Sequence, residues 1–321
     1  MSVTWGLLST ALINEAILAG AAESEAVEVV AVASRDEARA QSYAQEHGIE
    51  RAYGSYEGLL ADAGVEAVYI SLPNGLHGQW ALRALEAGKH VLVEKPFSRR
   101  PDEVERAFDA AEAARLVLSE GFMWRHHPQT ARVIELVESG AIGRLRVVRA
   151  AFGFSLAEER GTADTRFDPA LEGGALMDVG SYCVNALRLF GGEPVRARGE
   201  QVVGPSGVDV VFTGALAFAD ELVGHFDCGF VVPRRAGLEL VGGAGSIFVP
   251  DPFSIAETGL ELRRGDAEPE QIPIQPVNHY RLELENVSAA IRGEGQLLLG
   301  REDAVGQART IDALYRSASA G

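Results

Sequence analysis

Cysteine is scarce in this chain, and long apolar runs are missing. The two cysteines, Cys183 and Cys228, are too few for a disulfide framework and match no metal-ligand spacing. No stretch approaches the ~18 uninterrupted apolar residues that a membrane span requires. The first twenty residues include Asn14 and Glu15 and lack a basic leader, so we expect no signal peptide. These absences favour a cytoplasmic protein in a reducing compartment, without a membrane partner.

Basic charge is also in short supply. The 29 lysines and arginines face 46 aspartates and glutamates, and the formal net charge is −17 at pH 7. Such a surface repels phosphate backbones, so we expect no nucleic-acid partner. The 321 residues suffice for two domains with separate cores, and a hydrophobic share of 47% is ordinary for a globular protein.

Strand and helix patterns alternate in the first third of the chain. Apolar strands are predicted at 3–8, 27–33, 67–72, 90–94 and 116–118, with helical segments between them. This alternation predicts a doubly wound parallel sheet, an α/β fold of the Rossmann type. We place a nucleotide-binding domain at 1–121.

The pattern changes after residue 121. Half-buried strands are predicted at 145–154, 195–203, 208–219, 221–228 and 236–242, followed by helices at 280–292 and 301–317. This order predicts an α+β domain over 122–321, with an open, mostly antiparallel sheet and helices on one face.

The first strand runs into the loop where a dinucleotide fold places G-x-G-x-x-G/A. Here Ser9 and Ala11 stand at glycine positions, and Asn14 replaces the small residue. Small side chains still let a backbone approach a pyrophosphate, and a helix N-terminus offers free N–H groups. An ordinary turn between strand and helix is the alternative. The candidate cofactor residues of this loop are Ser9, Thr10, Ala11, Leu12 and Ile13.

Two further loops at the same sheet edge are candidates for cofactor contacts. Ser34 and Arg35 end the second strand, and a hydroxyl followed by a guanidinium suits the 2′-phosphate of NADP, although NAD remains possible. Asp36 comes one position late and suits the first turn of the next helix. The third strand leads into a loop that either covers the nicotinamide or is a plain Pro-Asn-Gly turn; its candidates are Ser71, Leu72, Pro73, Asn74 and His77.

The fourth strand ends in Glu94-Lys95-Pro96. Proline removes the next ladder donor and fixes the turn, so Lys95 is held at the carboxyl end of a core strand. Ligands bind at that edge of open α/β sheets. A solvated surface lysine is the alternative interpretation.

A Gly-Gly pair, Gly173-Gly174, opens a predicted helix in the second domain. Asp178 and Tyr182 lie four residues apart on it and therefore share one face. A carboxylate near a phenol can orient it, and a nearby Lys95 would favour the phenolate. The alternative is a surface helix with a buried tyrosine.

These motifs together resemble the Gfo/Idh/MocA family of nicotinamide-dependent oxidoreductases over essentially the whole chain. Glu94-Lys95-Pro96 matches the family signature, and the segment 120–129 resembles the stretch that crosses between the family's domains. The Gly-Gly-x-x-x-Asp-x-Gly-x-Tyr pattern is similar to the branch of glucose–fructose oxidoreductase, xylose dehydrogenase and dihydrodiol dehydrogenase. Inositol dehydrogenases carry histidine at the position of Tyr182, which disfavours that substrate class.

The resemblance implies roles for particular residues. Lys95, Asp178 and Tyr182 fall on the family's catalytic positions, and Glu94, Trp124 and Arg125 join the candidate cofactor contacts. His126 stands where the family usually has an aromatic residue and is expected to tune the substrate pocket. The adjacent pair of His126 and His127 cannot easily meet one ion, so we expect no metal. The candidate substrate residues are Lys95, His126, Phe154, Arg166, Asp178 and Tyr182.

The expected activity is hydride transfer between NADP(H) and a sugar carbinol or carbonyl, as in an aldose 1-dehydrogenase of the xylose dehydrogenase type. Tyr182 would move the hydroxyl proton, Lys95 would hold the substrate oxygen, and Asp178 would orient the pair. A ketoreductase acting on a nucleotide-linked sugar is the alternative within enzymes. The missing loop glycines leave a non-catalytic cofactor-sensing protein as a third hypothesis. The resemblance also implies a homodimer or homotetramer built through the second domain's sheet.

Overall fold

The computed structural model describes residues 1–256 and 258–319. Contacts divide the chain into two compact units. The N-unit comprises residues 1–123 together with 278–305, and the C-unit comprises 124–277 together with the chain from Gly306 onwards. The predicted boundary near residue 121 left the segment 278–305 in the second domain, whereas its contacts place it in the N-unit.

The N-unit is built on a parallel sheet of six strands in the order β3-β2-β1-β4-β5-β6. Every strand pair in it is parallel, which confirms the predicted doubly wound sheet. Its strands are β1 (Val3–Leu8), β2 (Val27–Ala33), β3 (Arg51–Tyr53), β4 (Ala67–Ile70), β5 (His90–Glu94) and β6 (Leu118–Gly121).

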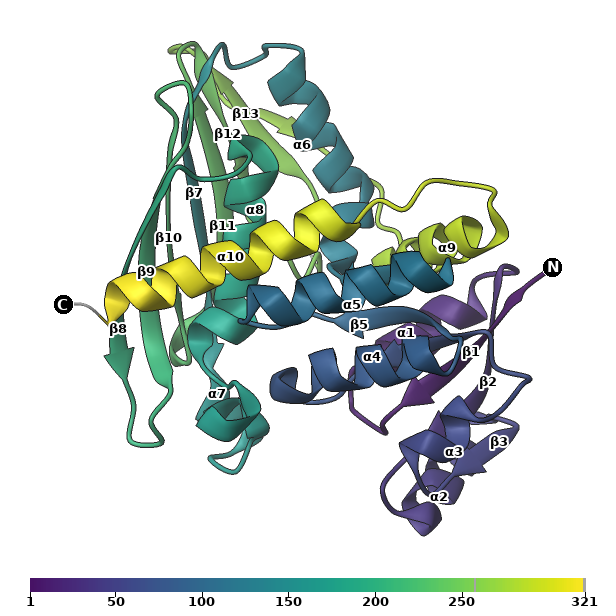
Figure 1. Ribbon diagram of the computed structural model, residues 1–321. Helices are drawn as coiled ribbons and strands as arrows, with labels where there is room; N and C mark the ends of the chain where they lie inside the picture. The colour runs from purple at the N-terminus through teal and green to yellow at the C-terminus, as the bar shows by residue number, and fades with distance from the viewer. Residues whose placement is uncertain (257, 320–321) are drawn as a thin grey trace. The chain divides into compact units, whose positions relative to one another are not determined.

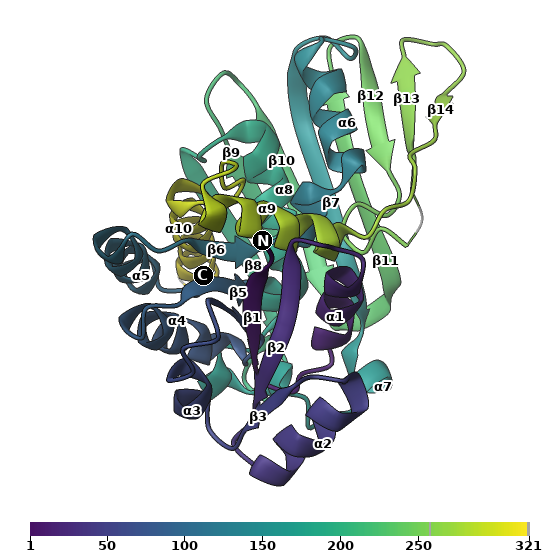
Figure 2. The same ribbon diagram turned by 90° about the vertical axis from the view of Figure 1, so that its right-hand side faces the viewer.

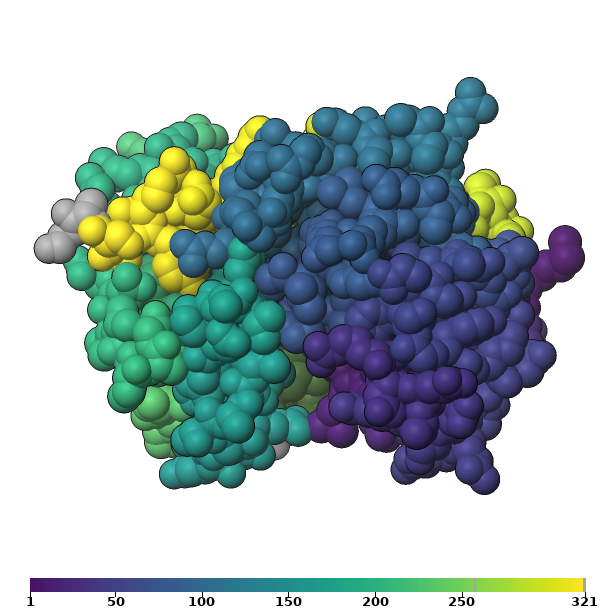
Figure 3. Space-filling model, turned by 60° about the horizontal axis from the view of Figure 1, so that its bottom comes forward, coloured from purple at the N-terminus to yellow at the C-terminus, as the bar shows by residue number. Residues whose placement is uncertain are grey.

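Helices cover both faces of this sheet, as Figure 2 shows. Trp5 and Leu7 point to the face of α1 and α9, where Leu284 completes a shared core. Gly6 points to the other face, and a Cβ there would lie 2.7 Å from Leu59 of α3. The helices are α1 (Asn14–Ala22), α2 (Glu37–His47), α3 (Tyr56–Leu60), α4 (His77–Glu86), α5 (Pro101–Ala114) and α9 (His279–Arg292). The outer surface runs unbroken from the purple N-terminal segments to the blue segments of α4 and α5 (Figure 3).

The last strand of the N-unit lies later in the chain than predicted. The sequence pattern placed it at 116–118, but β6 pairs Leu118 to Gly121 with β5. The reason is the end of α5. Arg115 adopts a left-handed conformation, and the Leu116 N–H donates to the Ala111 carbonyl, so these residues close the helix.

The C-unit is built on an eight-stranded sheet in the order β14-β13-β12-β11-β7-β10-β9-β8. Only β7 and β10 pair in parallel, so the predicted mostly antiparallel sheet is confirmed. The strands are β7 (Leu145–Ser155), β8 (Arg196–Val203), β9 (Asp209–Ala217), β10 (Val223–Gly229), β11 (Val231–Gly242), β12 (Gly245–Val249), β13 (Leu260–Arg264) and β14 (Glu270–Ile272).

Helices α8 (Ser181–Gly191) and α10 (Arg301–Ala318) lie against one side of this sheet (Figure 1). Leu187 of α8 comes so close to Gly224 of β10 that a Cβ on the glycine would lie 2.8 Å away. Tyr315 of α10 packs edge-on against Phe212 of β9 at 5.6 Å between ring centroids. The remaining helices are α6 (Pro128–Glu138) and α7 (Leu156–Arg160).

No helix in the described part of the chain combines the length and the apolar character needed to cross a bilayer.

Candidate functional site

The loop after β1 lacks the glycines of the dinucleotide fingerprint and is held by side-chain hydrogen bonds. Strands β1 and β4 pair Leu8 with Ile70, so the next residues, Ser9 and Ser71, are neighbours. Their hydroxyl oxygens lie 2.8 Å apart. Asn14 accepts a bond from the Ser71 hydroxyl at 2.7 Å and donates one to the Ser9 carbonyl at 2.8 Å. The sequence pattern treated Asn14 only as a departure from the glycine fingerprint, and its structural role was missed.

The same loop leaves backbone donors available. Helix α1 has no side-chain cap. The N–H groups of Leu12 and Ile13 have no acceptor among the described residues. An uncapped helix N-terminus with free N–H groups favours an anion, such as a diphosphate. The predicted loop residues are therefore compatible with a bound dinucleotide despite the missing glycines.

Positive charge gathers at the end of β2. Asp36 caps α2 by accepting a bond from the Arg39 N–H at 2.7 Å, which confirms its predicted structural role. Burial raises the pKa of the Tyr56 hydroxyl, and the nearby guanidinium groups of Arg35 and Arg39 oppose that rise. Two arginines thus surround the place where a dinucleotide fold reads the adenosine ribose.

His77 joins two loop backbones at the sheet edge. Its Nε2 lies 2.6 Å from the Leu72 carbonyl, and its Nδ1 lies 2.9 Å from the Pro96 carbonyl. Burial lowers the pKa of His77 to about 4. Both ring nitrogens are engaged with protein, so the imidazole tethers the loops after β4 and β5. Its predicted contact with the cofactor stays a prediction.

Lys95 follows β5 directly, and its backbone is fixed by Glu94. The Lys95 N–H donates to one carboxyl oxygen of Glu94 at 3.2 Å, and the Tyr69 hydroxyl donates to the other. The peptide bond between Lys95 and Pro96 is cis. Lys95 therefore lies directly after a buried strand, and the Glu94 carboxylate holds its backbone in place.

A buried acid next to this carboxylate was missed by the sequence reasoning. Glu283 of α9 is 1% exposed, and neither carboxyl oxygen has a hydrogen-bond partner among the described residues. Burial raises its pKa well above the usual value, and the charge of Glu94 raises it further. Glu283 looks like one more polar residue in an amphipathic helix, so no sequence signal could have identified it.

In the C-unit the Gly-Gly pair fits a narrow space. A Cβ on Gly173 would lie 2.3 Å from the Arg166 carbonyl, and one on Gly174 would lie 2.1 Å from an Asp209 carboxyl oxygen. Asp209 is buried and accepts bonds from the Leu176 N–H at 2.7 Å and the Tyr315 hydroxyl at 2.8 Å. It anchors the start of the helical segment that carries Asp178, and the sequence reasoning did not find it.

That segment differs from the predicted regular helix. Residues Leu176–Gly180 form a π-helix, and α8 begins at Ser181. Asp178 pairs with the Arg166 guanidinium at 3.0 Å, so the structure brings these two predicted site residues together. Asp178 is the main cause of the raised Arg166 pKa, ahead of burial, which lowers it.

Aromatic rings surround Tyr182. Its ring lies 5.6 Å from Phe152 and 5.5 Å from Phe253, centroid to centroid. Trp124 packs edge-on against the same Phe253 at 5.5 Å. The structure thus collects Trp124 and Tyr182 around one phenylalanine that the sequence reasoning missed. Phe154, a predicted substrate residue, packs against Phe230 at 5.9 Å between ring centroids.

The segment after β6 carries the remaining predicted residues. The Trp124 indole is buried, and its N–H has no partner among the described residues. Arg125 donates to the Asn185 side chain at 3.3 Å. His127 caps α6 by accepting from the Gln129 N–H at 3.0 Å, and its neighbour His126 is half-buried. No group of three or more possible metal-binding side chains was found in the described residues.

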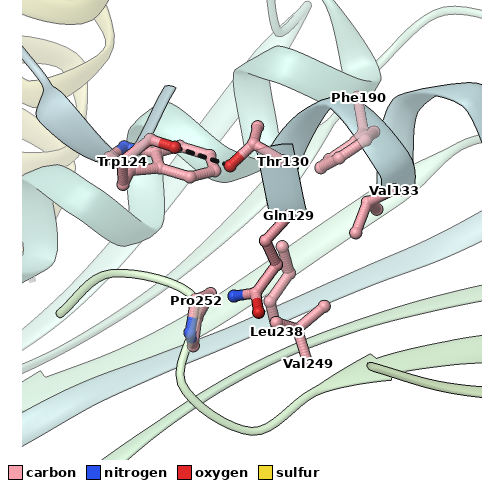
Figure 4. A pocket seen from close by; sticks show the side chains of 8 residues that line it. All are labelled: Trp124, Gln129, Thr130, Val133, Phe190, Leu238, Val249 and Pro252. Carbon is pink, nitrogen blue, oxygen red and sulfur yellow. Dashed lines mark hydrogen bonds between the residues drawn. The ribbon is translucent and has the colours of Figure 1, made fainter. Parts of the chain in front are cut away.

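A small pocket lies beside α6 in the C-unit (Figure 4). Thr130 donates to the Trp124 carbonyl at 2.6 Å at one end of it. The pocket is lined by Trp124, Gln129, Thr130, Val133, Phe190, Leu238, Val249 and Pro252. Trp124 is the one predicted site residue among these, and most of the lining is apolar. We therefore interpret the pocket as packing space between α6 and the sheet.

Comparison with known families gives two matches along the chain. Residues 10–122 match the model of the GFO/IDH/MocA oxidoreductase family with an NAD-binding Rossmann fold. Residues 130–248 match the model of a C-terminal domain of the same family. Together the matches cover more than half of the chain and most strands of both sheets.

Individual relatives extend over the full length. A D-xylose 1-dehydrogenase (NADP(+)) from Haloferax volcanii is 39% identical over 99% of this chain and 98% of its own. The human trans-1,2-dihydrobenzene-1,2-diol dehydrogenase is 35% identical over 86% of this chain and 82% of its own. A 3-ketoreductase from Actinomadura kijaniata, solved with NADP and TDP-benzene, superposes with a TM-score of 0.91 at 30% identity and covers 99% and 98% of the two chains.

Proposed function

We propose that this chain, which belongs to the GFO/IDH/MocA family of oxidoreductases, transfers a hydride between NADP and a sugar carbinol or carbonyl. The observation that carries the proposal is the 39% identity with an NADP-dependent xylose dehydrogenase over 99% of the chain. An aldose oxidised at its anomeric carbon is the favoured substrate.

The residues of the N-unit fit the cofactor. The N–H groups of Leu12 and Ile13, which have no protein acceptor among the described residues, would bind the diphosphate. Arg35 and Arg39 would bind the 2′-phosphate that distinguishes NADP from NAD. Trp124, the first residue of the C-unit, is a further proposed contact, because its buried indole N–H has no partner in the described chain. The nicotinamide, when bound, supplies the hydride chemistry.

The proposed catalytic roles follow from side-chain chemistry. Tyr182 takes the proton of the reacting hydroxyl during oxidation and returns it during reduction. Lys95 holds the substrate oxygen from a backbone fixed by Glu94. Asp178, itself held by Arg166 at 3.0 Å, orients a substrate hydroxyl.

The test is an assay of D-xylose and a panel of other sugars with NAD and NADP in parallel. Lys95→Met and Tyr182→Phe should each lower kcat by ~10²–10⁴-fold, as expected for lost proton transfer or charge stabilisation. Near wild-type turnover by either folded variant would refute the assigned role.

Lys89→Met is the matched control, because Lys89 is the chain's other lysine. Its ammonium is buried and donates to the Asp62 carbonyl at 2.6 Å and the Val65 carbonyl at 2.7 Å. This variant should lose stability while kcat stays close to the wild-type value.

A ketoreductase acting on a nucleotide-linked sugar is the second candidate. It is favoured by the TM-score of 0.91 with the 3-ketoreductase at 30% identity. Turnover of a nucleotide-linked ketosugar together with no turnover of free aldoses would select it. NADPH binding without turnover of either class would instead favour a cofactor-sensing protein.

We further propose a cytoplasmic homo-oligomer formed through the helix-free side of the C-unit sheet. Gly224 and Leu238 point to the helices, so the adjacent Val223 and Phe248 point the other way, and these two are 48% and 42% exposed. Light scattering after size exclusion measures the oligomeric state. A monomer at micromolar concentration would contradict the proposal.

A further inference from the structure

The loop after β1 does more than tolerate the absence of glycines. We propose that Asn14 is a positioning residue for the cofactor, because its amide clamps this loop to the end of β4 through Ser9 and Ser71. The clamp holds the backbone of residues 10–13 in the shape that receives a diphosphate. This inference rests on the proposed NADP-dependent function.

The direction of each hydrogen bond in the clamp can be derived. The Asn14 Oδ1 atom can only accept, so the single hydroxyl proton of Ser71 points to it over 2.7 Å. The Ser71 hydroxyl oxygen is then free to accept. The Ser9 hydroxyl therefore donates to Ser71, where its oxygen lies 2.8 Å from the hydroxyl oxygen and 3.1 Å from the carbonyl oxygen. The Asn14 Nδ2 atom returns to the Ser9 carbonyl over 2.8 Å. The three residues therefore form a closed ring of bonds.

The ring also reaches the backbone that would face the cofactor. The Ser9 hydroxyl oxygen accepts from the Ala11 N–H at 3.0 Å, so the ring is bonded to the segment that leads into α1. All three side chains are buried, and Asn14 is fully inaccessible, so water does not compete for these bonds.

Ser9 shows why a clamp is needed. Its φ is 142°, a conformation that glycine adopts readily and side-chain-bearing residues rarely adopt. Glycine loops reach this shape without help but are also free to leave it. Here three side chains hold a strained backbone, so the loop is organised before the ligand arrives.

The first experiment measures NADPH affinity by quenching of tryptophan fluorescence in the full chain. Asn14→Ala should weaken binding about tenfold, the usual effect of losing one or two hydrogen bonds. Ser71→Ala should weaken it by a similar factor. Because both residues belong to one ring, the double variant should bind nearly as well as the weaker single variant.

The matched control is Asn286→Ala. Asn286 also donates its amide to a carbonyl, of Gln296 at 2.9 Å, and accepts an N–H, of Leu298 at 3.0 Å. It lies within α9 of the N-unit, and its two bonds join this helix to the segment that follows it. Its replacement should leave the NADPH affinity unchanged, because its bonds do not involve the cofactor loop.

A fragment ligand separates positioning from general damage. Adenosine 2′-monophosphate lacks the diphosphate bridge and would contact the end of β2 alone. Its affinity should be the same in wild type and Asn14→Ala. Thermal unfolding of each variant identifies any that does not fold, and Ser71→Ala then serves in place of Asn14→Ala.

Charge provides a readout that a purely structural role would not move. Asn14→Asp keeps the size of the side chain and the acceptor for Ser71, but adds a negative charge behind the diphosphate position. NADPH binding should weaken more than in Asn14→Ala, and added salt should narrow the gap between the two variants.

The outcomes are distinct. Folded Asn14→Ala and Ser71→Ala that bind NADPH as tightly as wild type would overturn the clamp. An equal loss of affinity for adenosine 2′-monophosphate would also overturn it, since the damage would then be general. If wild type binds neither ligand, the proposed function itself fails, and the inference fails with it.

Discussion

Glu283 is a buried carboxyl group whose pKa depends on burial and on a second carboxyl group, Glu94. Glu94 accepts hydrogen bonds from the Lys95 N–H and the Tyr69 hydroxyl. Glu283 is buried near it without a partner among the described residues. Burial raises the pKa of Glu283 well above its usual value, and the charge of Glu94 raises it further, so Glu283 keeps its proton.

Glu283→Gln should therefore stabilise the protein at neutral pH. The folded-state pKa of Glu283 is raised above its ordinary value of 4.5. Above pH 4.5 the unfolded chain releases this proton while the folded chain retains it, so the free energy of unfolding falls as the pH rises. The slope is about 1.4 kcal/mol per pH unit until the folded pKa is reached. Glutamine removes this loss.

Urea unfolding of wild type and Glu283→Gln at several pH values between 4 and 8 measures the effect. The advantage of the variant should be smallest near pH 4 and grow with pH. A stability difference that does not change with pH would mean that Glu283 is ionised in the folded protein.

At this scale the sequence identified residues that belong to motifs and missed those that act across the fold. Lys95 was predicted as a site residue because a proline follows a strand end, and Tyr182 because of its spacing from Asp178. Asn14 and Asp209 form their contacts with residues far along the chain, and no local pattern announces such partners.

Among the elements, the π-helix Leu176–Gly180 is the one most dependent on a remote group. Its first N–H group, that of Leu176, donates to the Asp209 carboxylate of β9, to which the Tyr315 hydroxyl of α10 also donates. Burial raises the pKa of Asp209, while these hydrogen bonds lower it. One carboxylate thus joins a strand, a helix and the start of the segment that carries the proposed catalytic residues.

Asp209→Ala should destabilise the protein by about 2–4 kcal/mol, because two buried donors lose their acceptor. Tyr315→Phe removes one hydroxyl and should cost about 1 kcal/mol. In both variants kcat should fall while the KM for NADP stays constant, since the cofactor contacts proposed in the N-unit are untouched.

Unfolding curves and steady-state kinetics measure these two effects. Asn278→Ala is the control, because Asn278 likewise accepts two N–H groups at the start of a helix, α9. It should lose about 1 kcal/mol of stability with kcat unchanged. An unaltered kcat in Asp209→Ala would show that the segment keeps its geometry without the carboxylate.

Element prediction succeeded where side chains repeat and failed where the backbone departs from the common periods. Apolar runs and alternation identified most strands of both sheets. A π-helix has no period that composition reveals, so Leu176–Gly180 was predicted as regular helix. The strands β12 to β14 are short and lie between turns, and the pattern did not separate them from loops.

For the whole molecule, the net charge of −17 implies repulsion among the acidic side chains, which no single ion pair removes. Excess charge of one sign repels itself in the compact state more than in the unfolded chain. Raising the salt concentration from about 10 mM to about 500 mM shortens the Debye length from about 30 Å to a few ångströms. The midpoint of thermal unfolding should therefore rise over this range.

Differential scanning calorimetry in sodium chloride measures this shift. Sucrose solutions that add no ions serve as the control for effects unrelated to charge. A midpoint that stays level or falls with salt would show that attractive ion pairs, such as the one between Arg292 and Glu66 at 2.7 Å, outweigh the repulsion.

Two domains could be predicted from the change of pattern near residue 121. The pattern could not show that residues 278–305 belong to the N-unit. Helix α9 joins the N-unit because Gly20 of α1 lets its backbone approach closely; a Cβ there would lie 2.7 Å from the Arg281 nitrogen. An amphipathic pattern indicates that one face of a helix packs against the rest of the fold, but it does not indicate which unit supplies that surface.

The position of α9 in the chain has a consequence for synthesis. Leu284 and Val287 complete the N-unit core, and Ser288 accepts a hydrogen bond from the Trp5 indole at 3.3 Å. The ribosome makes these residues only after every strand of the C-unit sheet. The N-unit emerges first from the ribosome but cannot complete its core until α9 has been made. Until then, the apolar surface that α9 covers is exposed to chaperones and proteases.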